Sequence, residues 1–393
     1  MNDVPQQGCT RPALREAAVA AGASSLATRP RLHAHGGRGR RPQGFVLVAV
    51  LAALVVITLL AAAVALVSER AMAEAQANVA AFEGEVAMTG TRDTMLYLLN
   101  TQRQTFGGIT VDDQMVWSVG QATALREDVE ERGGQSPLPI GNEIRLDGTP
   151  YVGVGETRFA LQDDAGLFSP NWASPIFRER FFQQRGIAPP EVPGIEATRL
   201  DYQDPDMLYR LGGAEAAAYR SKGLPSPSNR PLVTPLEARR IMQWDKVLAG
   251  LDDAAVMSLL TVSRISIPNV NSAPLQVLRT IPGVDEDMAA RMVALRDQTP
   301  FLLVWQLVQT FGLPLSDDDT LLLFAANSGT LRLWHNATGP VRVIHWTLTP
   351  YDEGGRPWRL DYEIALPRDE VTDNALARTT QTPLFAPPAA AGR

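Results

Sequence analysis

The longest apolar stretch of the chain lies near its N-terminus, where residues 45–67 include one clearly polar side chain, Thr58. A helix needs about 20 apolar residues to cross a membrane, whereas the apolar part of a cleaved secretory signal usually has about 7–15. Five arginines and no acid lie between residues 17 and 43, and positively charged flanks stay in the cytoplasm. The pattern therefore predicts one membrane span with a cytoplasmic N-terminus and an exported C-terminal region.

A helical pattern continues beyond this apolar run. Apolar residues recur at roughly helical spacing, namely Met72, Val79, Phe82, Val86, Met95 and Leu98. Charged residues supply the polar side, and the glycines at positions 84 and 90 each weaken the helix by about 1 kcal/mol relative to alanine. The sequence predicts that the helix ends near Phe106-Gly107-Gly108.

Alternating apolar and polar residues predict strands in two separate regions of the chain. In the first region, an Asp147-Gly148 turn is predicted to join residues 142–146 and 149–152 into a hairpin, and residues 157–162 form another strand. In the second region, alternating segments begin near residues 331, 341 and 358. Mostly helical sequence of about 165 residues separates the two regions.

The middle of this helical region, residues 265–297, contains a helix-hairpin-helix pattern. Ser272 is predicted to cap the first helix and Asp285 the second, with a turn at Pro282-Gly283 between them. The apolar residues expected to face inward are Leu275, Leu278, Met288, Met292 and Leu295.

Helix-hairpin-helix units often bind DNA by presenting backbone N–H groups to a phosphate. The DNA-binding form usually has a second glycine two residues after the first, and this chain has Asp285 there, followed by Glu286 and Asp287. Because three carboxylates would repel a phosphate, the sequence favours a structural role for the hairpin.

Four acidic residues gather in a turn-rich segment before the hairpin: Asp201, Asp204, Asp206 and Glu215, the last after Gly212-Gly213. Hard cations such as Ca²⁺ bind six to eight oxygen ligands, often from loops of this kind. The 12-residue EF-hand pattern is missing. The alternative interpretation is an exposed acidic loop in which Asp201 or Asp204 caps a helix.

Composition narrows the function classes. The net charge is −7, and the first 44 residues hold seven arginines and two acids, so the remaining chain carries −12. Such an acidic region disfavours binding to nucleic acid, whose phosphates bind Lys and Arg.

The cysteine and histidine residues give no sign of a cross-link or a zinc site. Cys9 is the one cysteine, so an intramolecular disulfide is impossible. His335 and His345 lie on predicted strands and are interpreted as structural residues rather than zinc ligands.

The join between leader and apolar run resembles the processing site of type IV prepilins and type II secretion pseudopilins. A basic leader ends at Gly44, and Phe45 opens the apolar run. In those families a membrane peptidase cuts after the glycine and methylates the new N-terminal phenylalanine. Major pilins carry Glu at the fifth mature position, where this chain has Ala49. The resemblance implies that this subunit lacks one contact with a subunit ahead of it.

The order of motifs in the chain resembles that of type II secretion system protein K, the large minor pseudopilin. The matching stretches are QDDAGLFSPN at 162–171, DYQDPD at 201–206, GGAE at 212–215, NRPL at 229–232 and PNVNSAP at 268–274. The chain departs from the family pattern in several places. Asn171-Trp-Ala stands where Asn-x-Asn is usual, Tyr202 where Trp is usual and Ser272 where Thr is common, and the leader is unusually long.

This resemblance implies a non-enzymatic subunit at the tip of a periplasmic pseudopilus. The expected fold is α+β and pilin-like: a long N-terminal transmembrane helix packed on a small antiparallel sheet, with a large inserted helical domain of SAM-like or helix-hairpin-helix units. Other minor pseudopilins, the major pseudopilin, prepilin peptidase and the inner-membrane secretion platform are the expected partners. Secreted substrate and the outer-membrane channel are further candidates. Calcium is the candidate cofactor, with Asp201, Asp204, Asp206 and Glu215 as its ligands.

The resemblance also predicts domain boundaries and a location in the bacterial inner membrane. The predicted segments are the leader (1–44), transmembrane segment (45–67), periplasmic helix (68–110), early pilin-like strands (111–163), first helical subdomain (164–262), second helical subdomain (263–327), late pilin-like strands (328–370) and tail (371–393).

Two other function classes fit the sequence less well. An enzyme has little support, because the exported part has no nucleophile elbow, P-loop, HExxH motif or Cys–His pair. A membrane-anchored protein for DNA uptake would suit an anchor followed by a helix-hairpin-helix unit, but the acidic charge and Asp285 argue against it.

Overall fold

The structure is a computed structural model. It describes residues 43–111, 138–315, 321–335, 339–350, 355–367 and 382–385, with side chains from residue 46 onward. The chain divides into two compact units, Met1–Ala71 and Met72–Arg393. Residues 112–137 of the predicted early-strand segment (111–163) lie outside the described residues, as do most of the tail and the leader before residue 43.

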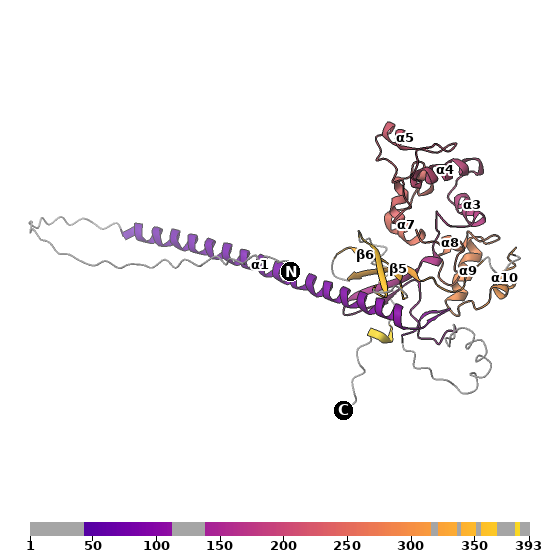
Figure 1. Ribbon diagram of the computed structural model, residues 1–393. Helices are drawn as coiled ribbons and strands as arrows, with labels where there is room; N and C mark the ends of the chain where they lie inside the picture. The colour runs from indigo at the N-terminus through magenta and orange to yellow at the C-terminus, as the bar shows by residue number, and fades with distance from the viewer. Residues whose placement is uncertain are drawn as a thin grey trace, which may run out of the picture. The chain divides into compact units, whose positions relative to one another are not determined.

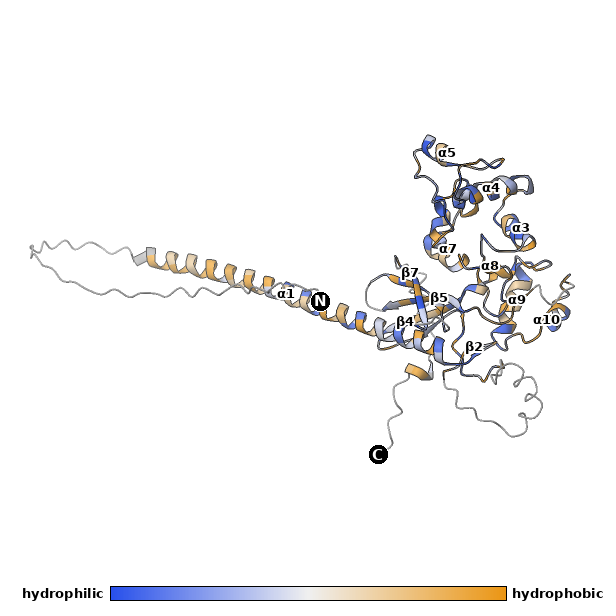
Figure 2. Cartoon of the chain, viewed as in Figure 1, coloured by the Kyte–Doolittle hydropathy of each residue, from blue (hydrophilic) through white to orange (hydrophobic). Residues whose placement is uncertain are grey.

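The described part of the first unit is the beginning of one helix, α1 (Gln43–Thr101). Its apolar side chains from Val46 to Val67 are exposed, and this part of the helix is coloured as hydrophobic in Figure 2. By length and composition α1 is a candidate membrane span, consistent with single-pass anchoring. The orientation of the chain across the membrane stays a prediction.

In the second unit, α1 ends at Thr101, earlier than predicted. The N–H of Gln102 still donates to the Leu98 carbonyl at 2.8 Å, after which the chain enters a small hairpin of β1 (Gln104–Thr105) and β2 (Gly108–Ile109). Gly108 has φ +138°, and a Cβ there would lie 2.1 Å from the Ile144 carbonyl oxygen. The glycine therefore serves the turn and its close packing rather than the end of the helix.

Five strands form one antiparallel sheet in the order in which they occur along the chain. They are β3 (Asp147–Val152), β4 (Thr157–Asp163), β5 (Ser328–His335), β6 (Val341–Leu348) and β7 (Trp358–Leu366). The three predicted late strands are confirmed. Figure 1 shows β5 beside β6, and both strands follow the helical region in the chain.

The predicted Asp147-Gly148 hairpin is wrong. Both residues belong to β3, where Asp147 is opposite Gln162 of β4 and the register shifts before Pro150. Ile144 instead forms an isolated bridge with Ile109, and the turn between β3 and β4 comes at residues 153–156. Gly148, with φ +83°, marks an irregularity within the strand and not a turn.

Each face of the sheet contributes to a different core. Alternate residues such as Phe159, Leu333 and Trp346 pack with the last turns of α1, where Met95 and Leu98 are buried. The opposite face carries the buried residues Ala160, Trp334, Val341, Val343 and Leu366, which cluster with Met257. The long helix, the antiparallel sheet and the helices therefore fit a pilin-like α+β fold.

The helical region lies between two neighbouring strands, because β4 ends at Asp163 and β5 begins at Ser328. Its helices are η1 (Asp164–Gly166), α3 (Pro175–Gln184), η2 (Pro189–Glu191), α4 (Val192–Gln203), α5 (Ala216–Ser221), η3 (Pro235–Arg240), α6 (Trp244–Val247), α7 (Asp253–Leu259), α8 (Leu275–Leu278), α9 (Glu286–Arg296) and α10 (Val304–Phe311). A short helix η5 (Pro383–Phe385) lies beyond the sheet in sequence.

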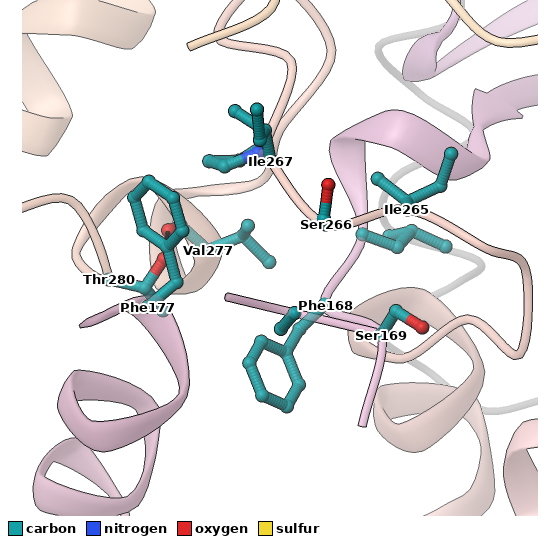
Figure 3. Close-up of a pocket in the computed structure, with 11 residues that line it drawn as sticks. Phe168, Ser169, Phe177, Ile265, Ser266, Ile267, Val277 and Thr280 are labelled. Carbon is teal, nitrogen blue, oxygen red and sulfur yellow. Dashed lines mark hydrogen bonds between the residues drawn. The ribbon is translucent and has the colours of Figure 1, made fainter. Parts of the chain in front are cut away.

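One hydrophobic core runs through the helical region and includes residues from both predicted subdomains. Figure 3 shows part of this core, where Phe168 and Phe177 approach Ile267 and Val277 around a small cavity. The cavity holds about 10 Å³, close to the lower limit for one water molecule, so it is a packing defect and not a ligand site. The rings of Phe168 and Phe181 stack nearby with centroids 3.8 Å apart.

The helix-hairpin-helix details are partly as predicted. Asp285 caps α9 by accepting from the Met288 N–H at 2.8 Å, as expected. Ser272 does not cap α8, because its hydroxyl donates to Asp163 instead. Leu295 is exposed, and the inner face of α9 ends with Arg296, whose guanidinium bonds the carbonyls of Val270 and Ala273. The assignment to SAM-like or helix-hairpin-helix units stays a prediction.

Candidate metal site and the base of the helical insertion

The predicted processing residues lie at the start of α1. Gly44 and Phe45 are helical, and Ala49 lies in the exposed apolar part of the helix. Cleavage and methylation at this position stay predictions.

The structure brings together three of the four predicted metal ligands. Asp201 lies in the last turn of α4, Asp204 follows the end of that helix, and Glu215 precedes α5. One ligand oxygen from each lies within 4.8 Å of the others. Asp206 is outside this group, since its Oδ1 accepts from the Leu208 N–H at 2.7 Å and organises the loop.

Two glycines let the chain return to α4 at this point. Gly212 has φ +82°, which a residue with a side chain rarely adopts, and a Cβ on it would lie 3.1 Å from the Gly194 Cα. A Cβ on Gly213 would lie 2.0 Å from Asp201 Oδ2. The Gly-Gly pair therefore permits the close approach that places Glu215 beside the two aspartates.

Three carboxylate oxygens of this cluster are buried without a hydrogen-bond partner: Asp204 Oδ1 and both oxygens of Glu215. Glu215 is only 2% exposed. Burial, together with Asp201, Asp204 and Asp206, raises the pKa of Glu215. A buried carboxylate is costly unless a cation or hydrogen-bond donors compensate it, so these unpaired oxygens fit the requirements of a cation site.

One cation of the chain itself already occupies part of the cluster. Arg210 Nη1 donates to Asp201 Oδ1 at 2.7 Å and also to Asp204 Oδ2. Sequence reasoning missed Arg210, which is a single basic residue in an apolar run and matches no ligand pattern. With three carboxylates and one guanidinium, the cluster keeps a formal charge of about −2 when all groups are ionised.

The donor chemistry of the cluster fits a hard divalent cation. All candidate ligands are carboxylate oxygens, from the last turn of α4 and from the segment that joins α4 to α5, and Ca²⁺ accepts such ligands in flexible geometry. The alternative of a purely exposed acidic loop does not describe Asp201 and Glu215, which are both buried.

A second polar network lies at the base of the helical insertion, where β4 gives way to η1. Asp163 is fully buried and accepts four hydrogen bonds, from the Ala165 N–H, the Ala326 N–H, the Asn269 amide and the Ser272 hydroxyl. These bonds join the motif stretches 162–171 and 268–274 to the segment that returns to β5. Burial raises the pKa of Asp163 to about 6, against the opposing effect of these donors.

The next residue, Asp164, joins the same base to the sheet. Its Oδ2 accepts from the hydroxyls of Ser263 and Ser328, and it lies 2.8 Å from His345 Nε2. His345 Nδ1 lies 2.8 Å from Asp361 Oδ2 on β7. The prediction of a structural His345 named no partners, because they come from segments far apart in the sequence.

The start of α9, where a DNA phosphate would sit, is occupied by the chain's own carboxylate. Asp285 accepts the Met288 N–H, and the side chains of Glu286 and Asp287 are exposed beside it. A phosphate would have to displace Asp285 from this N–H while approaching two further acids.

Comparison with known proteins gives little sequence similarity. No family model matches the chain, and no curated protein matches it. Among solved structures, the chain is similar to one chain of the crystal structure of the GspK-GspI-GspJ complex from the enterotoxigenic Escherichia coli type 2 secretion system, with 15% identity and a TM-score of 0.39. The similarity covers 64% of this chain and 95% of that one. A TM-score this low does not establish a shared fold.

Proposed function

We propose that this chain is a minor pseudopilin of a type II secretion system that caps the tip of the periplasmic pseudopilus and helps start its assembly. One observation carries the proposal: the helix α1 begins with exposed apolar turns suited to a bilayer and ends in turns buried against an antiparallel sheet. That combination couples a membrane anchor directly to a folded exported domain, as a pilin-like subunit requires.

The subunit enters the inner membrane with its N-terminus in the cytoplasm. Prepilin peptidase cuts between Gly44 and Phe45 and methylates Phe45. The basic leader and the Gly–Phe join at the start of the apolar run support this step.

Other pseudopilins then pack along the part of α1 that lies beyond the membrane run. Met72, Val79, Phe82 and Val86 are more than half exposed and recur at spacings of seven, three and four residues. This spacing forms a stripe on one side of a helix, as in helix–helix seams. Contact with the inner-membrane secretion platform, and with secreted substrate or the outer-membrane channel, belongs to the same proposal.

Two features favour the tip over an interior position. Ala49 removes the carboxylate that would pair with the N-terminal amine of a subunit ahead, and the insertion at residues 164–327 is far larger than the sheet that hosts it. In a helical fibre each subunit must leave room for the next one. A subunit with a large insertion and no need of a forward contact suits the end of the fibre.

The proposed role is structural, with calcium as its one cofactor. Asp201, Asp204 and Glu215 would hold the ion, which would neutralise their mutual repulsion and tie α4 to α5. A ligand that binds only the native state stabilises it by about 2.7 kcal/mol at a hundredfold excess over Kd. The full chain in detergent should therefore melt at a higher temperature in CaCl₂ than in chelator, and Glu215→Gln should reduce the difference. Equal melting temperatures with no bound metal would refute the calcium site.

Mass spectrometry of the mature N-terminus, in cells with an active prepilin peptidase, tests the pseudopilin assignment. A methylated Phe45 supports it, and a mature protein that still carries the leader overturns it. Immunogold labelling of pseudopili with antibody against the exported region tests the tip. Label at one end is expected, and label along the whole fibre would exclude a cap. A salt-dependent gel shift with duplex DNA would instead favour the DNA-uptake alternative.

A further inference from the structure

The proposed calcium site already holds one positive group, the guanidinium of Arg210. We propose that Arg210 is an internal competitor of the metal: it neutralises Asp201 and Asp204 in the metal-free protein and leaves them when a divalent cation binds. This inference rests on the calcium site proposed above and goes beyond it, because it assigns a role to a residue that is not a ligand.

The geometry of Arg210 supports competition rather than simple surface pairing. One nitrogen, Nη1, donates to a carboxylate oxygen of Asp201 and to one of Asp204, so it occupies the point between them. Asp201 is fully buried, while the Arg210 side chain is 41% exposed. A side chain with this much exposure can leave toward solvent, whereas the buried carboxylate must remain.

The oxygens that Arg210 leaves free are too few for a complete calcium shell. They are Asp204 Oδ1 and the two oxygens of Glu215, whereas Ca²⁺ takes six to eight oxygens. Asp201 is the most buried acid of the cluster, and its Oδ1 is already committed to Arg210. Binding the metal through all three carboxylates therefore requires the guanidinium to withdraw.

Charge leads to the same conclusion. A divalent ion and a guanidinium between the same two aspartates would repel each other strongly at short distance, and the partly buried setting screens that repulsion less than bulk water does. Three carboxylates attract either cation, but the smaller ion with the higher charge gains more from them. The two cations are therefore alternatives at one position.

Displacement of Arg210 would also release the apolar loop that carries it. Met207, Leu208, Tyr209 and Leu211 are 58–99% exposed, so they contribute little buried surface to hold the loop in place. Polar contacts hold the loop instead, and two of them are the ion pairs of the Arg210 guanidinium with Asp201 and Asp204, which would be lost on displacement. Cation binding would thus make the exposed apolar segment more mobile while it holds the carboxylates of the cluster in fixed positions around the ion.

Calcium titration calorimetry on the full chain in detergent tests the proposal, with Arg210→Gln as the variant. Removing the competitor should tighten calcium binding by about fivefold, the upper end of what a partly exposed ion pair contributes. Arg220→Gln is the matched control. Arg220 is also exposed and follows Glu215 by five residues, but its guanidinium donates to the Ala216 carbonyl of its own helix. The control should bind calcium as the unaltered chain does.

The outcomes separate the two proposals. Tighter binding in Arg210→Gln, or binding in this variant alone, supports competition. Calcium binding that is unchanged or weaker in Arg210→Gln overturns competition and leaves the calcium site intact. No binding in either protein removes the calcium site and this inference together.

Hydrogen exchange gives a second measurement that also reports whether the variant is folded. Amides of residues 207–211 should exchange faster in the unaltered chain once CaCl₂ is added, while those of Arg210→Gln should be fast with or without calcium. Exchange in the rest of the insertion should stay equal in the two proteins. Slower exchange at residues 207–211 on adding calcium to the unaltered chain would contradict release of the loop.

Discussion

His345 Nε2 lies 2.8 Å from Asp164 Oδ2. This contact joins strand β6 to η1, the first turn of the helical insertion. The other ring nitrogen lies 2.8 Å from Asp361 on β7. A ring that bonds a carboxylate through each nitrogen carries both protons and a positive charge. Burial alone would lower the pKa of His345, but the two carboxylates raise it to about 9. The insertion is therefore held to the sheet by an ion triad in which His345 and Asp164 are buried and Asp361 reaches the surface.

Replacing His345 by Gln should destabilise the exported domain by about 2–4 kcal/mol, because Asp164 would keep a buried charge with no cation beside it. Chemical denaturation of the full chain in detergent measures the change. The double variant His345→Gln/Asp164→Asn should recover part of the loss, since it removes the uncompensated charge as well. Additive losses in the double variant would show that the two residues are not coupled.

The triad also predicts how stability depends on pH. The folded pKa of His345 is raised above its unfolded value of about 6.5, so its contribution is fully present below pH 6.5 and is lost as the pH rises through about 9. A shift of this size corresponds to roughly 3 kcal/mol. The difference in unfolding free energy between the unaltered chain and His345→Gln should therefore shrink between pH 6.5 and 9.5. A difference that stays constant over this range would contradict the charged state of His345.

The same network predicts that the folded protein loses stability at low pH. Burial would raise the pKa of Asp164 and of Asp361, but hydrogen bonds from His345 and the other donors lower both. Groups with lowered pKa values contribute stability above their unfolded values, near pH 4, and lose it as the pH falls further. Asp361→Asn should flatten the acid limb of a stability–pH curve, and an unchanged limb would exclude a contribution from this carboxylate.

Asp163→Asn should cost about 2–4 kcal/mol, even though the two side chains have nearly the same shape. Asp163 Oδ2 accepts from the Asn269 amide and the Ser272 hydroxyl, and an asparagine NH₂ at that position would face donors. Thermal unfolding of the full chain measures the loss. Ser272→Ala removes one donor only, so it should cost less, about 1 kcal/mol. A larger loss in Ser272→Ala than in Asp163→Asn would contradict the central role of the carboxylate.

Gly213→Ala should disrupt the acidic cluster, because the added Cβ would meet Asp201 Oδ2 at 2.0 Å. The carboxylate or the loop must then move, and calcium binding should weaken by tenfold or more, about 1.4 kcal/mol. Gly194→Ala is the control, since the nearest atom to its added Cβ is 4.0 Å away. Equal calcium affinity in the two variants would show that the close approach at Gly213 does not matter.

Phe82→Asp should leave folding unchanged, because Phe82 is 69% exposed. If this part of α1 packs against other pseudopilins, the same variant should reduce pseudopilus assembly, since it places a charge in an apolar seam. Thermal unfolding and fibre counts by electron microscopy separate the two effects. Normal fibres with a Phe82→Asp subunit would remove this stripe from the proposed interface.

Local sequence pattern determined the elements that depend on neighbouring residues. The apolar run of α1 and the strands β5, β6 and β7 follow from periodicity within each segment, so hydrophobic spacing alone predicts them. Asp201, Asp204 and Glu215 were also predictable as a group, because the acids are close in sequence and the Gly212-Gly213 pair allows the chain to turn back.

Where a residue had two possible partners, the tertiary structure decided which of them it contacts. Asp147-Gly148 has the composition of a turn, but pairing with β4 holds it in a strand. Ser272 could cap a helix, but its hydroxyl is taken by Asp163, more than a hundred residues earlier. His345 and Arg210 acquired their roles in the same way, from carboxylates that only the folded chain places within hydrogen-bond distance. Local periodicity cannot encode such choices, because the energy of a buried charge depends on groups brought together from distant parts of the chain.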